Sequence, residues 1–288
     1  MKSGGVPKIS CIVPAYRNAG DLCQTLSSLT KLFSQVDYAS LEILVIDGSV
    51  EDPALTWMQD SFLPSNVSLV YINEPDLGPY DAMNKGISRA NGEWLWFLNS
   101  GDLALGFCEE NTLSTRHSII IGSWYSSELN QTFYPRFETG LGHGRHHEIG
   151  HGLCHQSMLF KFELYSTRHY DYAVYHYAAE LNFYVDALIQ SDYAIDYRLR
   201  CLYNTSDGLS KRKAIRHWND CANIYRKHRL KLSTYRRIYR YCAAFRLQMT
   251  TRVKSLYCKQ RIRILRMHRW ARFLLIRVLT LLGLCYRQ

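Results

Sequence analysis

The stretch EPDLGPYDAMNKGISRANGEWLWFLNSGD, residues 74–102, alternates between polar loop, helix, apolar strand and polar loop. Gly78-Pro79 is a turn signal, and Asp81 is placed to cap a helix whose apolar residues recur at helical spacing. The apolar run 94–98 is typical of a buried strand and leads into Asn99-Ser100-Gly101-Asp102. In an α/β chain, a carboxylate after such a strand lies in the crevice where open sheets bind ligands. The stretch therefore predicts a ligand site at a sheet edge.

The rest of the chain up to residue 210 continues the strand–helix alternation. The predicted strands are 9–13, 42–46, 68–72, 118–124, 154–160 and 193–202, and the predicted helices are 21–33, 55–62 and 178–189. This pattern predicts an α/β fold with a doubly wound, mostly parallel, Rossmann-like sheet. The strands that end at Pro14, Asp47, Asn73 and Asn99 would bring their loops together as a nucleotide-sized crevice. Residues 125–153 lack clean periodicity and are interpreted as loops and an edge hairpin on an acceptor side.

Charge divides the 288 residues into two predicted domains. Residues 1–210 hold 13 Lys and Arg against 24 Asp and Glu, whereas residues 211–288 hold 22 against one. We therefore expect a large domain at 1–210 and a basic, helical C-terminal extension at 211–288 that meets an anionic surface. The anionic surface is either a membrane face or a nucleic acid.

Cysteines and apolar runs bear on the compartment. The nine cysteines are scattered without CxxC pairs, which is typical of reduced thiols in a cytosolic protein. The segment before the first strand has no apolar signal-peptide region, and no uninterrupted apolar run is long enough for a spanning helix. We therefore expect a cytoplasmic protein.

Several motifs together resemble an inverting family 2 glycosyltransferase with the GT-A fold, of the colanic acid/O-antigen branch that builds bacterial surface polysaccharides. The resemblance covers about residues 8 to 210. It rests most on YDAMNKG at 80–86 and FLNSGD at 97–102. Shorter matches are PAYRN at 14–18, VIDGS at 45–49, EPD at 74–76 and HQ at 155–156. The resemblance implies transfer of a hexose from a nucleotide-diphosphate sugar.

The resemblance assigns the donor side to residues at the strand ends. It implies that Pro14 and Tyr16 line the base pocket and that Asp47 bonds the uracil or ribose. The donor is further bracketed by Asp76, Asp81, Lys85, Asn99 and Ser100. Plain turn chemistry is the alternative for Asp47-Gly48, helix capping for Asp81 and a solvated helix charge for Lys85.

A divalent cation is implied by the same resemblance. Hard carboxylate oxygens hold Mn²⁺ or Mg²⁺, and the cation neutralises a departing diphosphate. The wider family has a DxD motif here, but this chain has Asn99 and Gly101 at those positions. Asp102 is the predicted metal ligand, and its alternative role is a loop cap.

The acceptor side follows from the second half of the match. The family carries an Asp early in the helix after the HQ strand, and the aligned residue here is Glu180, which is therefore the predicted general base. Asp171 is the rival base. His155 and Gln156 are expected to contact sugar hydroxyls or phosphate, unless His155 is a core residue. A loop with Gly208 and Ser210 is expected near the diphosphate.

The end of the chain has an amphipathic pattern. Apolar residues between Ile264 and Leu282 form one helical stripe, and arginines occupy the opposite arc. This is typical of a helix that lies in a membrane interface with arginines on anionic lipid. We therefore expect a peripheral protein on the inner face of the cytoplasmic membrane, with a lipid-linked glycan as acceptor. A helix packed on the catalytic domain is one alternative, and a nucleic-acid surface, which is not expected, is the other.

Two other classes compete with this interpretation. His147-Glu148-Ile149-Gly150-His151 matches the HExxH signature of zinc proteases, but the surrounding glycines disfavour the helix that this signature needs. A non-catalytic scaffold that binds membrane or nucleic acid through the basic extension is the second, favoured by the absent DxD carboxylates.

Overall fold

The computed structural model describes residues 8–49, 63–135, 153–204 and 214–228. In chain order its elements are β1 (Lys8–Ala15), α1 (Ala19–Phe33), β2 (Ser40–Asp47), β3 (Val67–Asn73), α3 (Pro79–Arg89), β4 (Trp94–Phe97), β5 (Leu103–Gly106), α4 (Glu110–Leu113), β6 (Ile119–Ser126), β7 (Gln131–Phe133), η1 (His155–Ser157), β8 (Met158–Lys161), η2 (Phe162–Tyr165), α5 (Ala179–Gln190), β9 (Tyr193–Tyr203) and α7 (Ala214–Lys227). The predicted α/β alternation is confirmed. The predicted helix at 55–62 lies outside the described residues.

The strands form one mixed sheet in the order β3-β2-β1-β4-β8-β6-β9-β5, with β7 paired to β6. The first four strands are parallel, as predicted. Beyond β4, however, β8 runs antiparallel to both β4 and β6, and β5 runs antiparallel to β9. The expectation of a mostly parallel sheet is therefore correct only for the N-terminal half. Of the antiparallel pairs among the described residues, only β6 with β7 is a hairpin, and the others bring together strands that lie far apart in the chain.

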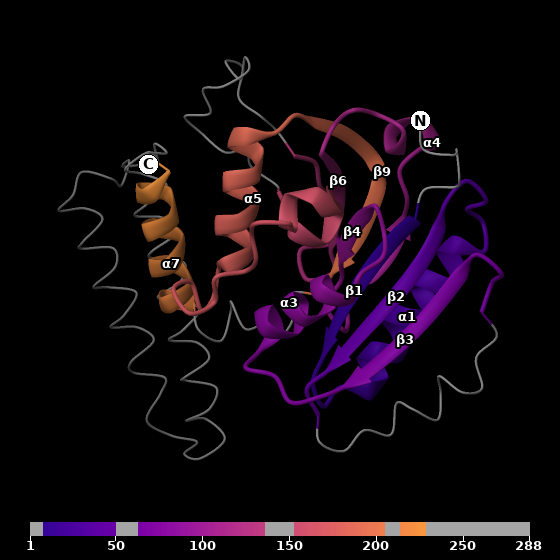
Figure 1. The fold of residues 1–288 in the computed structure, drawn as a ribbon, viewed down its shortest axis with the longest axis horizontal. Helices are drawn as coiled ribbons and strands as arrows, with labels where there is room; N and C mark the ends of the chain where they lie inside the picture. Colours follow the sequence, from indigo (N-terminus) through magenta and orange to yellow (C-terminus); the bar gives the residue numbers. More distant parts are fainter. Residues whose placement is uncertain (1–7, 50–62, 136–152, 205–213, 229–288) are drawn as a thin grey trace, which may run out of the picture.

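Helices cover both faces of the parallel half (Figure 1). Alternate residues of β1 point to opposite faces, so Ile9, Cys11 and Val13 pack with the apolar stripe of α1. Ile12 faces the other way, toward α3 and α5. A Cβ on Gly86 would lie 2.5 Å from Cγ2 of Ile12, so glycine is required where α3 approaches β1.

The second half of the chain supplies the remaining cover. Figure 1 shows α5 and α7 side by side, next to the sheet. The predicted edge hairpin is confirmed by the antiparallel pairing of β6 with β7. Of the helices in the described part of the chain, none is long and apolar enough to cross a bilayer. The predicted interfacial helix at 264–282 and the predicted domain boundary at residue 210 lie outside the described residues.

Candidate functional site

Asp47 ends β2 at the carboxyl edge of the parallel strands, and its side chain is fully buried. Its Oδ1 accepts hydrogen bonds from the backbone amide of Ser49 at 2.8 Å and from the Ser49 hydroxyl at 2.6 Å. Its Oδ2 accepts the hydroxyl of Tyr71 on β3 at 2.7 Å. These bonds hold the turn after β2 in one shape, and they combine the turn chemistry with the position that a donor-binding role requires.

Asp76 lies directly against this turn. A Cβ on Gly48 would meet Oδ2 of Asp76 at 2.2 Å, so the carboxylate occupies the space that only glycine leaves free. Oδ1 of Asp76 accepts the backbone amide of Gly78 at 2.8 Å. Burial raises the pKa of Asp76, and the nearby carboxylates of Asp81 and Asp47 add to that rise. The structure thus brings Asp47 and Asp76 together at the ends of adjacent strands.

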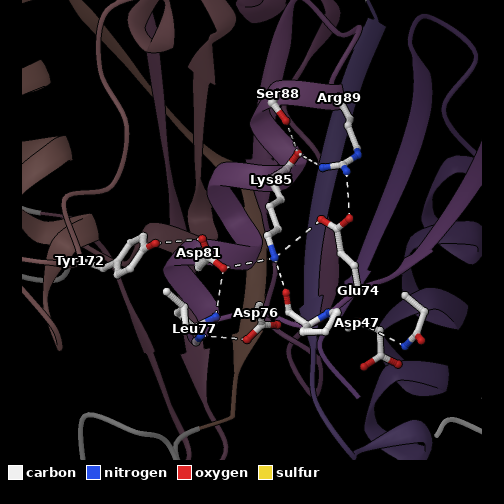
Figure 2. Close-up of polar contacts among 12 residues, drawn as sticks. Asp47, Glu74, Asp76, Leu77, Asp81, Lys85, Ser88, Arg89 and Tyr172 are labelled. Carbon is white, nitrogen blue, oxygen red and sulfur yellow. Dashed lines mark hydrogen bonds and ion pairs between the residues drawn. The ribbon is translucent and has the colours of Figure 1, made fainter. Parts of the chain in front are cut away.

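Lys85 ties the loop at 74–78 to α3 (Figure 2). Its ammonium group lies 3.3 Å from Asp81 and 3.7 Å from Glu74, and it donates a hydrogen bond to the carbonyl of Pro75. Arg89, one turn further along α3, pairs with Glu74 at 3.1 Å. Lys85 therefore anchors the loop that carries Asp76, and phosphate contact by this residue stays a prediction.

Asp81 does not occupy the N-cap position that the sequence suggested. The N-cap is Gly78, with φ of 122°, and α3 begins at Pro79, so the turn signal itself starts the helix. Oδ2 of Asp81 reaches back to the backbone amide of Leu77 at 3.0 Å, and Oδ1 accepts the Tyr172 hydroxyl at 3.0 Å (Figure 2). Asp81 thus connects the loop at 74–78 to the segment before α5.

Glu180 lies in the first turn of α5 and is half-buried. The hydroxyl of Tyr80, from the YDAMNKG motif, donates a hydrogen bond to its Oε2. Burial raises the pKa of Glu180, while the Tyr80 hydroxyl and the nearby His217 oppose the rise. A carboxyl group with a raised pKa is suited to take a proton near neutral pH. The rival, Asp171, lies in a turn where its Oδ1 accepts the amide of Val174 at 3.3 Å.

The loop after β4 is held by the carboxylate that ends it. Oδ1 of Asp102 accepts the backbone amide of Asn204 at 2.8 Å, and Oδ2 accepts that of Asn99 at 3.3 Å. Gly101 has φ of 102° and donates to the Thr25 hydroxyl at 2.9 Å. The Ser100 hydroxyl is buried and has no hydrogen-bond partner among the described residues.

The surroundings of Asp102 do not fit a metal ligand. Its side chain is only 2% exposed, and both oxygens take backbone amides. Burial raises its pKa to about 7, against the opposing amides of Asn204 and Asn99. Within the described ranges, no three or more His, Cys, Asp or Glu side chains are grouped as a metal site. These contacts correspond to the alternative role of a loop cap.

His155 and Gln156 are core residues in the structure, which differs from their expected contact with substrate. They form η1, so the predicted strand at 154–160 begins only at Met158. His155 is 4% exposed, bonds the Tyr170 hydroxyl through Nε2 at 2.8 Å and stacks on Phe97. Burial lowers the pKa of His155 to about 3, so the ring is neutral.

Gln156 is held by its two neighbours in the core. Its carbonyl accepts the Trp96 indole N–H at 2.7 Å, and its Oε1 accepts the thiol of Cys154 at 3.0 Å. Gly208, Ser210 and the HExxH match at 147–151 lie outside the described residues.

A base pocket was predicted at the end of β1, where Pro14 is buried and the chain becomes exposed at Tyr16. Pro14 accepts the backbone amide of Ser100 at 3.3 Å through its carbonyl, which joins the β1 and β4 loops. Tyr16 is 57% exposed, and the Arg17 guanidinium lies 5.2 Å from its ring centroid. Arg17 has φ of 51° and donates its amide to the Ser49 hydroxyl at 2.7 Å. The exposed ring of Tyr16 thus lies where the base pocket was predicted, and its contact with a base stays a prediction.

The site contains residues that the sequence did not single out. Tyr71 and Ser49 hold Asp47, Tyr172 holds Asp81, and Tyr80 holds Glu180. Tyr80 and Ser49 belong to the quoted motifs YDAMNKG and VIDGS, so their positions there were the available signal. The others hold carboxylates through contacts that no spacing rule identifies.

Comparisons with known proteins identify the family of the chain. The profile described as "Glycosyl transferase family 2" matches residues 10–180. A "PGL/p-HBAD biosynthesis glycosyltransferase" of Mycobacterium bovis is 28% identical over 167 residues, covering 56% of this chain and 62% of that relative. An uncharacterized glycosyltransferase of Mycobacterium tuberculosis is 33% identical over 96 residues, covering 33% of this chain and 34% of that relative.

Two solved structures share the fold. TarS 1-349 from S. aureus superposes with a TM-score of 0.54 at 14% identity, covering 91% of this chain and 77% of that chain. A mannosyltransferase from Pyrobaculum calidifontis, in complex with GDP-Man and Mn²⁺, superposes with a TM-score of 0.55 at 15% identity, covering 94% and 81%. Because the profile matches more than half of its residues, the chain belongs to glycosyl transferase family 2, with a GT-A-like fold.

Proposed function

We propose that the protein transfers a hexose from a nucleotide-diphosphate sugar to a lipid-linked glycan, with inversion, in surface polysaccharide biosynthesis. The observation that carries the proposal is one helix, α3, which connects both halves of the site. Its Asp81 and Lys85 hold the loop with Asp76 beside Asp47, and its Tyr80 holds Glu180. Donor carboxylates and a candidate base are thereby attached to one rigid element.

The proposed reaction is a single in-line displacement. The acceptor hydroxyl loses its proton to Glu180, its oxygen forms the bond to the anomeric carbon, and the bond from that carbon to the diphosphate breaks. Single displacement from the opposite face inverts the configuration. Glu180 suits the proton-accepting role because burial keeps its pKa above the ordinary range while Tyr80 stabilises its charged form.

Nucleotide-sugar donors are supported by the solved relatives in the fold. TarS has been determined with UDP and with UDP-GlcNAc, and the mannosyltransferase with GDP-Man and Mn²⁺. Mn²⁺ or Mg²⁺ is the cation that we propose for this chain, and its chemistry is to neutralise the departing diphosphate. Since Asp102 does not fit a ligand, no step is assigned to that residue through the cation.

The acceptor and the location are the finer parts of the proposal. The curated relative is named for PGL/p-HBAD biosynthesis, and the colanic acid/O-antigen branch rests on the motifs alone. We place the protein in the cytoplasm, on the inner face of the cytoplasmic membrane, because 22 Lys and Arg against one acid after residue 210 favour anionic lipid. Such contact brings a lipid-linked acceptor to the crevice.

A non-catalytic scaffold is the second candidate. Asn99 and Gly101 stand where DxD carboxylates are expected, and the remaining Asp102 is enclosed by backbone amides. A scaffold of this kind would use the basic extension to bind membrane or nucleic acid. It predicts no turnover of any donor.

The deciding experiment measures nucleotide release from UDP-glucose, UDP-GlcNAc and GDP-mannose by the full chain with Mn²⁺, Mg²⁺ or EDTA. Release from one donor, and its loss in EDTA, is the expected result. Turnover that persists in EDTA would remove the cation from the proposal and keep the transferase. No release together with no nucleotide binding, with a lipid extract supplied as acceptor, would favour the scaffold.

A further inference from the structure

The helix α7 is the described start of the basic extension, and it contains Asp220, the one acid among residues 211–288. Oδ2 of Asp220 accepts the backbone amide of Tyr177 at 2.8 Å. Nδ1 of His217, one turn earlier on α7, lies 2.5 Å from the carbonyl oxygen of Tyr177. Because a carbonyl only accepts, Nδ1 carries the proton in this bond. Two side chains of α7 therefore hold the backbone of one residue just before α5.

The start of α5 depends on this outside support. Its N-cap is Ala178, which has no side chain to cap the first-turn amides, and no side-chain cap bond is formed. Glu180 lies in that first turn, three residues after Tyr177. The position of its carboxylate is consequently set by how firmly the chain is held at Tyr177.

Apolar and polar contacts further along α7 seat the helix against α5 (Figure 1). Cys221 and Ile224 are buried in the same apolar cluster as Tyr80 and Phe183. Near the end of α7, the Lys227 ammonium donates to Oδ1 of Asn182 at 3.0 Å. Since Asn182 lies in α5 next to the Glu180 turn, α7 contacts both the segment before α5 and α5 itself.

The charge environment of Glu180 also involves α7. The titratable groups that face its carboxylate are Tyr80 from α3, Tyr170 from the segment before α5, Tyr184 from α5 itself and His217 from α7. Among these groups of the described chain, His217 is the basic one. A positive charge near a carboxylate favours its charged form. His217 therefore acts on Glu180 in two ways, through the backbone of Tyr177 and through its field.

We infer that His217 and Asp220 are positioning residues for Glu180, so that the first helix of the basic extension is part of the catalytic apparatus. The inference rests on the proposed function, in which Glu180 takes the acceptor proton. It gives the extension a role beyond attraction to an anionic surface. It also explains why the strongly basic segment contains one acid. The backbone amide of Tyr177 needs an acceptor, which Asp220 supplies and a Lys or Arg side chain does not.

The test uses full-length Asp220→Ala, Asp220→Asn and His217→Gln, with Asn223→Ala, an exposed and uncharged position on the same helix, as control. Asp220→Ala is expected to lower kcat by about tenfold or more while nucleotide Kd changes by less than about twofold, because misplacement affects the reacting geometry and not the donor site. Asp220→Asn keeps an acceptor oxygen for Tyr177 and is expected to restore most of kcat. Asn223→Ala is expected to match the unmodified chain.

His217→Gln separates the electrostatic effect of His217 on Glu180 from its hydrogen bond to the Tyr177 carbonyl. Glutamine keeps an N–H for the Tyr177 carbonyl but carries no charge, so the pKa of Glu180 is expected to rise. The base must be deprotonated, and the acid limb of kcat against pH therefore moves to higher pH. An unmoved limb, together with unchanged kcat in Asp220→Ala, would overturn the inference.

Hydrogen exchange supplies a reading that does not depend on turnover. Amides at 178–182 are expected to exchange faster in Asp220→Ala than in the unmodified chain and in Asp220→Asn. Equal exchange in all variants would overturn the positioning role even if no donor is turned over. Faster exchange in a chain that neither binds nor turns over any nucleotide sugar would keep the contact and reject the proposed function.

Discussion

The hydroxyl of Tyr80 on α3 donates a hydrogen bond to Oε2 of Glu180 on α5, although the two residues lie 100 positions apart in the sequence. Tyr80 is buried and belongs to the same motif as Asp81 and Lys85, which hold the donor loop. The bond thus connects the candidate base to α3, the helix that holds the loop at 74–78. Its direction favours the carboxylate form of Glu180, in opposition to the effect of burial.

Replacement of Glu180 by Gln tests the base directly. Glu180→Gln is expected to lower kcat by about 10²- to 10⁴-fold, the usual range for loss of a positioned general base. The Kd for nucleotide is expected to stay near that of the unmodified chain, because Asp47 and Asp76 are untouched. Asp171→Asn is the matched control, since asparagine retains the oxygen that accepts the Val174 amide. An inactive Asp171→Asn beside an active Glu180→Gln would transfer the base to Asp171.

Replacement of Tyr80 by Phe is expected to shift the pH dependence of turnover. The hydroxyl stabilises the charged form of Glu180, so its removal raises the pKa of that carboxyl further. Because the base acts deprotonated, the acid limb of kcat moves to higher pH, while kcat well above the limb changes little. Tyr172→Phe, which removes a bond to Asp81 and none to Glu180, is the control for loss of a tyrosine hydroxyl. A shift to lower pH would contradict the assignment.

Asp102 is expected to make stability depend on pH. Burial raises its pKa from an ordinary 3.8 to about 7, so between these values the folded chain holds a proton that the unfolded chain has lost. The stabilisation from this proton is complete below the ordinary pKa and is lost as pH rises through about 7. Asp102→Asn does not titrate, so the free energy of unfolding of the unmodified chain minus that of the variant is expected to fall over this window.

Chemical denaturation of both chains at several pH values between about 4 and 8 measures that difference. Each unit of pKa shift corresponds to about 1.4 kcal/mol, so the fall is on the order of a few kcal/mol. A difference that stays constant with pH would mean that Asp102 has the same pKa in the folded and the unfolded chain.

Glu42, toward the amino end of β2, is expected to support stability without a role in turnover. Its buried carboxylate accepts hydrogen bonds from the Ser10 hydroxyl at 2.5 Å, from the Asn91 amide at 2.9 Å and from the Asn91 side chain at 2.8 Å. Glu42→Ala leaves these donors unpaired and is expected to cost about 2 to 4 kcal/mol of unfolding free energy. Lys8→Met, which removes only a half-exposed partner at 3.2 Å, is expected to cost less than about 1 kcal/mol.

The pH dependence of Glu42 has the opposite sign to that of Asp102. Burial alone would raise its pKa, but the hydrogen bonds from Ser10 and Asn91 hold it below the ordinary value. Its stabilisation is therefore present above the ordinary pKa and is lost as pH falls through the folded value. In denaturation at acid pH, the difference in free energy of unfolding between Glu42→Ala and the unmodified chain is expected to become smaller. A difference that is the same at all pH values would show that the carboxylate is not stabilised by these donors.

Local patterns were sufficient for much of the fold. Apolar runs and helical spacing located the parallel strands and the helices α1 and α3, because both faces of that sheet half are covered and its strands are almost continuously apolar. The antiparallel pairings of β8 were not predicted, since the direction of β8 depends on pairing with β4 and β6 and not on its own composition. Short β5 carries too few residues for a periodic signal.

The residues of the candidate site likewise divide into those that local sequence identifies and those whose surroundings depend on distant segments. Asp47, Asp76 and Asp81 were singled out from the sequence because Asp47 follows an apolar strand and all three lie in the family motifs, which are local features. The enclosure of Asp102 and His155 was considered from the sequence only as an alternative, because their partners Asn204 and Tyr170 are supplied by distant segments.

The sequence by itself determined the α/β alternation, the family motifs, the strand-end carboxylates and the charge asymmetry, all of which follow from neighbouring residues. Only the tertiary structure decided which carboxylates are enclosed, that Tyr80 holds Glu180, and that α7 holds the start of α5. The physical reason is that burial and hydrogen bonding, which set the pKa and position of each group, depend on residues brought together across the fold. A residue's chemistry at the site is therefore a property of its partners as much as of its place in the chain.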